Sequence, residues 1–456
     1  MAADLEQERM TPRARRAALA GFIGFLVDYY DIYLPTLALT PALIYFQPKD
    51  LPATATTTIG YLVIAVTLIG RPIGAVIFGH FGDVLGRRRA TLIAVAGFSV
   101  CTILIAALPG YRSWGYGAIV VLIALRLIDG IFMGGEYTSA NPLAIEAAPK
   151  RLRGLVGGII ATAYPIGYLA ISISVTIVLL VLPAAGLDSP FVQWGWRLPF
   201  IFGGLIGAAF FVYFFYFVQD SEAWEKTAKA DRPTAPLKEL LGGRNLRSLA
   251  QVFLMMSGFW LGVQACVSVV PGLLETYFKR PAGEVTNGLI VANVVLIFAY
   301  LGCALLGQRL GRRPMLVASG VWTIVLSTSA YLLMVLTVQN RAPFVLTILF
   351  DTIALGLTLG PWGIVTTYIN ERFPTNVRAS GYGIGYSLAV ILPSFYGFYM
   401  LLLSRLIPYQ YTPVVLVALG GVLVLVGALL GPETRDVRLD SVHGVETVGA
   451  AELAGP

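Results

Sequence analysis

The stretch GHFGDVLGRRRA, residues Gly79 to Ala90, separates two long apolar runs and concentrates charge in a chain that otherwise carries little of it. Asp83 is followed by Gly86 and then by three consecutive arginines, Arg87 to Arg89. A carboxylate at a helix end can accept backbone N–H groups or pair with an arginine. Arginines that follow an apolar run are typical of a loop anchored at the cytoplasmic headgroups of a membrane. The stretch therefore indicates a charged loop between two membrane spans.

The rest of the chain has the composition of an integral membrane protein. Of its 456 residues, 57% are hydrophobic and 12% are charged, whereas soluble domains carry about 25% charged residues. Apolar runs of about 20 residues are long enough to cross a hydrocarbon core about 30 Å thick, and they cross it as helices. We therefore predict an all-α integral membrane fold with twelve transmembrane helices. The expected spans lie near 17–43, 55–79, 90–109, 116–141, 154–182, 195–218, 247–275, 286–307, 314–337, 342–368, 379–405 and 410–431.

The longest polar interruption divides the chain into two halves of six spans each. We expect a cytoplasmic N-tail at 1–16, an N-terminal six-helix bundle at 17–218, a central cytoplasmic loop at 219–246, a C-terminal six-helix bundle at 247–431 and a cytoplasmic C-tail at 432–456. Most of the 32 Lys and Arg residues fall in connectors on the side of the N-terminus, which places both termini in the cytoplasm. In the C-tail we expect Glu433 to contact the inner loops.

Two motifs recur in the second half with the same separation along the chain. DVLGRR from Asp83 returns as QRLGRR from Gln308, and EAAPKRLR from Glu146 returns as ERFPTNVR from Glu371. One register shared by two motifs indicates a duplicated six-span unit, which is typical of secondary transporters with a binding site between the halves. Because Gln308 replaces the acid, we expect the second loop to be held more weakly than the first.

On these motifs, the chain resembles the major facilitator superfamily of transporters over essentially its full length. GHFGDVLGRRRA is similar to the superfamily's loop between spans two and three, and ERFPTNVRASG is similar to the equivalent element of the second half. DYYDIY, RLIDGIFMGGE and WGWRLPF resemble the sugar-and-other-transporter branch, especially its metabolite:proton symporters. The resemblance implies two pseudo-symmetric bundles around a central cavity. It also implies a monomer of the bacterial cytoplasmic membrane that binds a small molecule and a proton and needs no cofactor.

The charged loops predict a cytoplasmic gate. Arginines that pair with acids on neighbouring helices can hold the inner face shut in one state and release it in the other. The alternative is that the arginines only anchor the loop. Arg71, inside span two, is expected to support the Asp83 loop rather than to touch substrate. The candidate gate residues are Gly79, Arg71, Asp83, Gly86, Arg87, Arg88, Glu146, Arg153, Gly311, Arg312, Arg313, Glu371 and Arg378.

Charges inside the spans predict a site for proton coupling. A carboxylate or guanidinium at mid-bilayer costs roughly 2.5–3.5 kcal/mol on insertion scales and usually marks function. Asp28 and Asp31 share one face of span one, and Arg126 and Asp129 share one face of span four. Spans one and four of each half line the cavity in the family that the chain resembles. We therefore expect Asp28 or Asp31 to carry the proton and Arg126 to change its affinity. The alternative is a fixed pair that clamps the two spans.

Polar and aromatic residues in the spans are candidates for the substrate cavity, although most aromatics in membrane proteins serve packing or the interface. Asp351 corresponds to Arg126 in the register of the repeat. Gln264 and Asn293 are equally compatible with substrate binding and with helix contacts. The candidates are Tyr29, Tyr33, Asp129, Tyr137, Tyr164, Trp260, Gln264, Asn293, Asp351 and Trp362, and Tyr168, Tyr368 and Tyr386 are further aromatics of this region.

The sequence favours proton-coupled symport of a small organic metabolite, such as an organic acid, by alternating access. A facilitator, a proton-antiport exporter and a transporter-like nutrient sensor are the alternatives. Span five reads GGIIATAYPIGYLA and lacks the Gly-Pro motif of the superfamily's antiporters, and no large cytoplasmic domain suggests a sensor. A phosphate-binding GxxxxGK[ST] loop is absent, and the three cysteines have no metal-site spacing. We therefore expect no enzyme activity, no metal and no nucleic acid partner.

Overall fold

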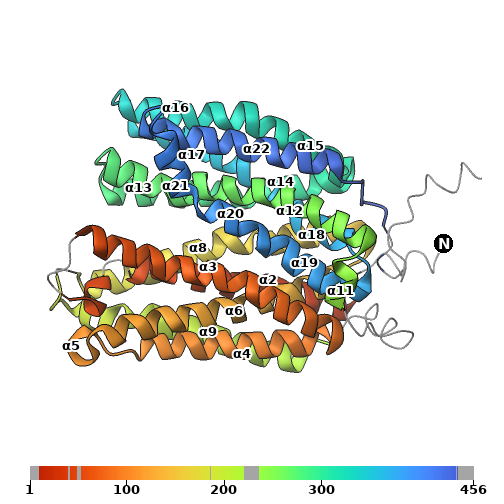
Figure 1. The fold of residues 1–456 in the computed structure, drawn as a ribbon, viewed down its shortest axis with the longest axis horizontal. Helices are drawn as coiled ribbons and strands as arrows, with labels where there is room; N and C mark the ends of the chain where they lie inside the picture. Colours follow the sequence, from red (N-terminus) through yellow and green to blue (C-terminus); the bar gives the residue numbers. More distant parts are fainter. Residues whose placement is uncertain are drawn as a thin grey trace, which may run out of the picture.

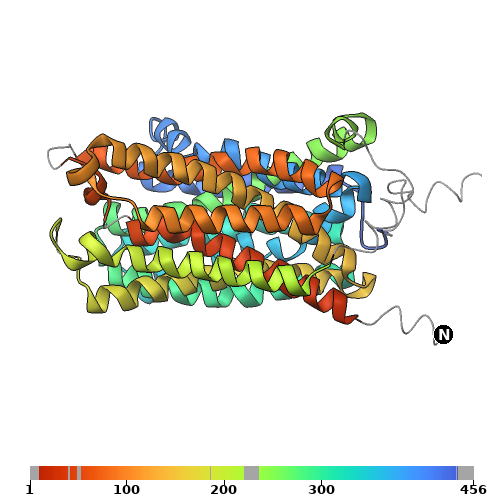
Figure 2. The same ribbon diagram turned by 90° about the horizontal axis from the view of Figure 1, so that it is seen from below.

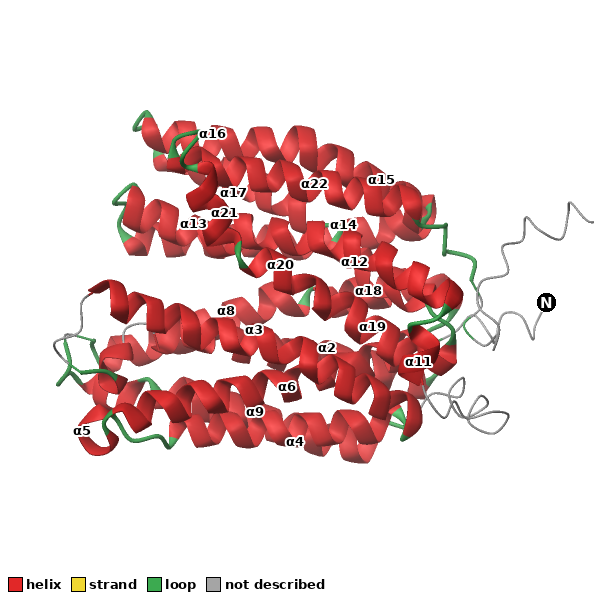
Figure 3. Ribbon diagram, in the orientation of Figure 1, coloured by secondary structure: helices red, strands yellow, loops and turns green. Residues whose placement is uncertain are grey.

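The computed structural model describes residues 10–39, 42–48, 53–184, 186–219, 236–437 and 439. Within this part of the chain the structure is nearly all helix, and it contains no strand. Long helices run along the long axis of the molecule (Figure 1), and the view turned by 90° shows the same alignment (Figure 2). Loops gather at the two ends of the bundle (Figure 3). The predicted all-α membrane fold is confirmed.

The first half contains six long helical segments, one of which consists of two consecutive helices. They are α2 (Pro12–Leu34) with the π-helical turn η1 (Pro35–Leu39), α3 (Ala53–Val84), α4 (Arg87–Ala106), α6 (Tyr116–Ala147), α7 (Arg153–Ala161) with α8 (Ala163–Val181), and α9 (Arg197–Phe217). Short elements between them are η2 (Leu43–Phe46), α5 (Tyr111–Trp114), η3 (Lys150–Leu152) and η4 (Phe191–Gly195).

The second half begins, within the described residues, at the short helix α11 (Pro236–Leu240), and several of its long segments are interrupted. Its first three segments are α12 (Gly243–Val263) continued by η5 (Gln264–Ser268), α13 (Val269–Gly272) and η6 (Leu273–Tyr277), then α14 (Ala282–Leu310), then α15 (Arg312–Trp322), η7 (Thr323–Ser327) and α16 (Thr328–Gln339). The others are α17 (Phe344–Leu359) with α18 (Trp362–Arg372), then η8 (Thr375–Val377), α19 (Arg378–Ser387), η9 (Leu388–Val390), α20 (Ile391–Ser394) and α21 (Tyr396–Leu403), and finally η10 (Tyr409–Tyr411) with α22 (Thr412–Leu430).

These helices overlap the spans expected from the sequence. Eleven helical stretches of the described chain are long and apolar enough to cross a membrane. The remaining expected span, 55–79, lies inside α3, a helix of 32 residues. Apolar side chains also cover the outside of the bundle, as on Leu180 and Leu406, which are 81% and 82% exposed. Such a surface suits contact with lipid rather than water.

Glycines bring α3 and α6 into backbone contact next to the region of interest. A Cβ atom added at Gly74 of α3 would overlap the carbonyl group of Ile131, and one added at Gly134 of α6 would overlap that of Arg71. Small residues at a helix crossing permit this approach, which is a common way of packing helices in membranes. The contact fixes Arg71 beside the part of α6 that carries Tyr137.

The two halves meet along a small set of helices. α3 and α6 of the first half pack on α19, and α7 and α8 pack on α14, with α18 also against α7. In Figure 1 the first half lies below and the second half above, with α18, α19 and α20 of the second half at the boundary. Residues placed on α3, α6, α7 and α19 can therefore contact both halves.

Candidate functional site

Two adjoining hollows lie between the halves, and Tyr386 lines both. We call them together the chamber. Neither hollow has room for more than about one water molecule, so the chamber is contracted in this structure. The first is lined by Leu68, Arg71, Tyr137, Trp260, Tyr386, Ser387 and Val390, and the second by Phe25, Tyr29, Ala161, Tyr300, Trp362, Thr366 and Tyr386.

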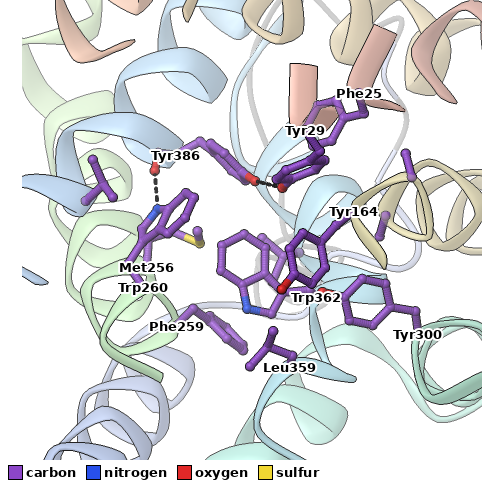
Figure 4. Packing of buried hydrophobic residues seen from close by; sticks show 14 of the residues in the cluster. Phe25, Tyr29, Tyr164, Met256, Phe259, Trp260, Tyr300, Leu359, Trp362 and Tyr386 are labelled. Carbon is purple, nitrogen blue, oxygen red and sulfur yellow. Dashed lines mark hydrogen bonds between the residues drawn. The ribbon is translucent and has the colours of Figure 1, made fainter. Parts of the chain in front are cut away.

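Aromatic side chains from both halves form the walls of the chamber. The hydroxyls of Tyr29 on α2 and Tyr386 on α19 are 3.1 Å apart and join the halves, as Figure 4 shows. The indole N–H of Trp260 donates to the carbonyl oxygen of Tyr386 at 2.8 Å. The ring centroids of Trp260 and Trp362 are 4.9 Å apart in an edge-to-face arrangement. The structure thus brings together Tyr29, Tyr137, Trp260 and Trp362 as the sequence analysis expected, with Tyr386 at their centre.

Arg71 is the one charged residue among those that line the chamber. Its Nη2 donates to Oδ2 of Asp28 at 2.9 Å, and its guanidinium lies 4.8 Å from the ring centroid of Tyr137. The expectation that Arg71 supports the Asp83 loop was wrong. Asp83 is twelve residues further along α3, a rise of about 18 Å. An arginine buried in a span pairs with the nearest carboxylate because an unpaired charge there is costly.

A second charged cluster lies beside the chamber and does not line it. Arg126 Nη1 donates to Asp31 Oδ2 at 2.8 Å and to Asp129 Oδ2 at 2.7 Å. Thr102 on α4 donates its hydroxyl to Asp31 at 3.0 Å. The cluster clamps α2, α4 and α6 together. The structure therefore separates the two span-one acids: Asp31 pairs with Arg126, whereas Asp28 pairs with Arg71. Asp129, expected in the cavity, contacts Arg126 instead.

Glu136 on α6 is a buried acid that the sequence analysis missed. Its side chain is fully buried, and neither carboxylate oxygen has a hydrogen-bond partner within the described chain. It packs against α2 where a side chain at Gly24 would overlap it. Arg126, Asp129 and Glu136 follow one another at helical spacing, so they share a face of α6. That spacing was the available signal.

The remaining cavity candidates lie around the chamber or inside the second half. Tyr164 packs edge-to-face on Tyr29 with 5.1 Å between ring centroids, and Tyr33 lies 5.9 Å from Tyr164. Neither Tyr33 nor Tyr164 lines the chamber, and the three other candidates do not line it either. Gln264 accepts the Ser268 hydroxyl at 2.6 Å, Asn293 donates to the carbonyl of Leu289 at 2.9 Å, and Asp351 is buried with no partner among the described residues.

At one end of the bundle, which we call the motif end, the carboxylate of Asp83 caps a helix of the other half. It accepts the backbone N–H groups of Ala379 at 3.1 Å and Ser380 at 2.9 Å, and the Ser380 hydroxyl at 2.7 Å. These groups form the first turn of α19, where N–H groups lack partners within the helix and a negative charge is favourable. Gly86, at φ 103°, takes a backbone conformation that suits glycine and lets α4 start directly after α3.

Glu146 connects the two halves at the motif end. Its Oε1 accepts Nη2 of Arg87 at 2.9 Å and Nη1 of Arg378 at 2.7 Å. Arg87 also donates to the carbonyl oxygen of Thr375 in the second half at 2.9 Å. The three charged side chains are almost wholly buried. Gly79 permits this closure, because a Cβ atom there would approach the Cα of Ser380 to 2.9 Å.

The repeated motif builds a related contact. Gln308 Oε1 accepts the N–H of Gly154 at 3.0 Å, at the start of α7 in the first half. Arg312 pairs with Glu371 at 3.3 Å, and Gly311, at φ 111°, has a positive φ like its counterpart Gly86. The neutral amide accepts one backbone N–H where Asp83 accepts two, and its Nε2 donates to the carbonyl of Lys150 at 3.4 Å. This difference follows from the substitution of Gln for Asp.

Other motif residues bind helix ends and the C-tail. Arg88 donates to the carbonyl of Val218 at 2.7 Å and Arg313 to that of Leu429 at 3.1 Å, each at the end of the last helix of its own half. Arg153 donates to the carbonyl of Val437 at 2.8 Å.

The C-tail contact expected for Glu433 is present. Its carboxylate accepts the N–H groups of Arg312 at 2.9 Å and Arg313 at 3.1 Å, at the start of α15. Asp436 pairs with Lys150 at 2.9 Å, and the hydrogen bond from Lys150 lowers the pKa of the Asp436 carboxyl. The rest of the expected C-tail contributes only residue 439 to the described chain, and 220–235 of the central loop lie outside it.

No group of three or more His, Cys, Asp or Glu side chains in the described part of the chain is placed to hold a metal ion. The three cysteines, Cys101, Cys266 and Cys303, are free and buried.

Comparison with known proteins gives a consistent family. The family described as Major Facilitator Superfamily matches residues 21–397. The inner membrane metabolite transport protein YhjE of Escherichia coli (strain K12) is 30% identical over 85% of this chain and 88% of its own. The shikimate transporter of the same strain is 30% identical over 87% of this chain and 89% of its own. Among solved structures, the proton:xylose symporter XylE is similar in fold, with a TM-score of 0.77 and 18% identity over 95% of this chain and 99% of that one.

Proposed function

The chain belongs to the Major Facilitator Superfamily and is a transporter of metabolites in the bacterial inner membrane, not an enzyme; from this premise we propose that it takes up a small organic carboxylate together with a proton. The observation that carries the proposal is the Asp28–Arg71 pair at the wall of a chamber between the halves. A buried cation that can exchange one carboxylate for another links substrate binding to the charge of Asp28.

The lining of the chamber supports a carboxylate with an apolar or planar body. Arg71 supplies a fork of N–H donors that suits a carboxylate. The rings of Tyr137, Trp260 and Tyr386 offer flat apolar surfaces. The Trp362 indole N–H and the Ser387 hydroxyl have no hydrogen-bond partner within the described chain, so each can bond a substrate oxygen. Shikimate, which the similar transporter carries, is a small carboxylate with a hydroxylated ring, whose oxygens suit these donors.

Coupling follows from competition for Arg71. When a substrate carboxylate binds Arg71, Asp28 loses its ion-pair partner in a site of low polarity. The unpaired Asp28 carboxylate then favours protonation, because a buried charge without a partner is costly. Substrate and proton therefore bind together. The cluster of Asp31, Arg126 and Asp129 remains a clamp between helices, since its acids share one arginine away from the chamber.

Alternating access would use the motif end as the cytoplasmic gate. The contacts of Asp83 with α19 and of Glu146 with Arg87 and Arg378 join the halves in this structure. Release of these contacts would open the chamber to the cytoplasm, and their return would close it. A few buried polar contacts suffice for two states that differ by a few kcal/mol.

The test compares Asp28→Asn with Asp31→Asn in proteoliposomes, with labelled shikimate and a panel of labelled small carboxylates as probes. We expect the wild type to accumulate a probe when a proton gradient is imposed. Asp28→Asn should lose accumulation but keep counterflow exchange, which needs no net proton movement. Asp31→Asn should keep the coupling ratio, since Asp129 still pairs with Arg126.

Two results would count against the proposal. A wild type that equilibrates its probe without accumulation under a proton gradient is a facilitator. If Asp28→Asn still accumulates the probe and Asp31→Asn does not, the coupled proton binds in the Arg126 cluster instead.

A further inference from the structure

We propose that Glu136 is a second proton-binding site, which takes the proton from Asp28 and releases it to the cytoplasm. This inference rests on the proposed function and extends it to the path of the proton. Three features carry it: the isolation of the carboxyl group, its position next to Asp28, and its place on the motif-end side of Asp28.

The isolation of Glu136 means that it is neutral in this structure. Its side chain is fully buried, and within the described chain both oxygens lack a hydrogen-bond donor. A carboxylate in such a place would lose its hydration without any compensation, which costs several kcal/mol. The other buried acids near it avoid that cost by pairing: Asp28 with Arg71 and Asp31 with Arg126. Glu136 has no such partner, so it holds a proton.

The groups that face Glu136 place it within reach of the coupling pair. On α2 it packs at Gly24, which is one helical turn before Asp28 on the same face. Asp28 on α2 and Arg71 on α3 are the charged groups that act on its carboxyl, and Tyr382 on α19 is the titratable group of the other half that interacts with it. From α9 the apolar ring of Phe210 reaches the same point of α2.

Glu136 also lies on the gate side of Asp28, because it packs at Gly24, which is nearer than Asp28 to the start of α2 at the motif end. Along α6 the acidic and amide residues follow in the order Asp129, Glu136, Asn141 and Glu146. Asn141 donates to the hydroxyl of Tyr382 at 3.1 Å, and Glu146 belongs to the contacts of the motif end. Ten residues of helix separate Glu136 from Glu146, a rise of about 15 Å. Water that enters through an open motif end would reach Glu136 before it reaches Asp28.

The cycle that follows is balanced for one proton. It begins with the Asp28 carboxylate on Arg71 and with protonated Glu136. Substrate binds Arg71, and Asp28 takes a proton from the outside. When the motif end opens, the O–H bond of Glu136 breaks and its proton passes to cytoplasmic water. The substrate leaves, Asp28 gives its proton to the Glu136 carboxylate, and the Asp28 carboxylate pairs again with Arg71. Closure requires this last transfer, because an ionised Glu136 cannot be buried without a partner.

The experiment measures proton movement and counterflow in the same proteoliposomes, with shikimate as the probe or, if it is not carried, the panel carboxylate that the wild type exchanges. Glu136→Gln keeps the shape and neutrality of the protonated acid but cannot carry a proton. We expect it to lose the external alkalinisation that accompanies uptake, while counterflow stays within about twofold of the wild type. Asp351→Asn is the matched control, since Asp351 is also buried and unpaired in the described chain but does not line the chamber. It should keep both activities.

A second measurement does not depend on transport. The infrared spectrum of the purified protein should contain a protonated-carboxyl band that is absent in Glu136→Gln and shifted in Glu136→Asp, a variant that keeps the acid if the Gln protein does not fold. An unshifted band in Glu136→Asp, or normal proton movement in Glu136→Gln, overturns the role of Glu136. A wild type that moves no protons overturns the proposed function instead, and in that case the infrared result still decides whether Glu136 is protonated.

Discussion

At the scale of single residues, the buried arginines Arg71 and Arg126 differ in how many carboxylates they bind. Arg126 gives hydrogen bonds to two carboxylates, whereas Arg71 gives one to Asp28 and turns its face to the ring of Tyr137. Arg126 is already paired with two acids, so it is not available to bind a further carboxylate. Arg71 has donors available at the wall of the chamber, and these define the proposed binding group for a carboxylate.

Substitution of Arg71 by Lys tests this assignment. Lys keeps the positive charge for Asp28 but lacks the planar fork that holds a carboxylate by two bonds. Loss of one hydrogen bond to a charged group corresponds to about 1.5–3 kcal/mol, so the KM for counterflow should rise about tenfold or more. Arg88→Lys, at the motif end, is the control and should leave KM unchanged. An unaltered KM in Arg71→Lys would show that the substrate binds elsewhere.

At the scale of helices, each half places a polar side chain on the first turn of a helix in the other half. Asp83 does this for α19, and Gln308 does it for α7. The caps differ in charge and in the number of backbone bonds, so the two contacts do not stabilise the closed motif end equally. The interaction of a carboxylate with a helix N-terminus exists only while the halves stay together, so it stabilises one state of the transporter over the other.

Asp83→Asn should therefore shift the protein towards the state open at the motif end. Asn keeps a capping oxygen but removes the negative charge, whose interaction with a helix N-terminus contributes about 0.3–2 kcal/mol, so the open population should rise up to several-fold or more. Alkylation of a cysteine introduced at Thr138, a buried position next to Gly79 and Gly383, measures this opening once the three native cysteines are replaced. Gln308→Ala should accelerate alkylation less. Equal rates in Asp83→Asn and the parent would refute the cap as a gate.

At the scale of the whole molecule, the repeat of the sequence appears as a repeat of contacts. Arg88 and Arg313 bind the ends of α9 and α22, and Gly86 and Gly311 start α4 and α15 with similar φ angles. The motif loops of both halves lie at the same end of the bundle, since they contact one another through Gly154 and Gln308. The positive charge of these loops predicts which side of the membrane that end faces.

Reporter fusions test that orientation. Green fluorescent protein fused after Pro456 should fluoresce, because the C-terminus is expected in the cytoplasm. Alkaline phosphatase, which is active only outside, should be active when inserted in the connector 183–190 and inactive at the C-terminus. The reverse pattern would show the opposite orientation in the membrane, and the motif end would then be an external gate.

Composition and motifs were enough to establish the class of fold, the approximate positions of the spans, the two halves and the charged loops. These features depend on local composition and on the rule that a membrane span must satisfy its own backbone hydrogen bonds, so they can be read without knowing how the helices pack. The resemblance carried by the motifs supplied the family, which the comparisons confirmed.

Which charges meet depends on how the helices pack. Spacing along α2 put Asp28 and Asp31 on one face, but the close crossing of α3 on α6 brought Arg71 to Asp28 and left Arg126 to Asp31. The isolation of Glu136 and the capping of α19 by Asp83 were likewise set by neighbouring helices. Pairing depends on the rotation and depth of each helix relative to the others, and the spacing of residues within one helix does not contain that information.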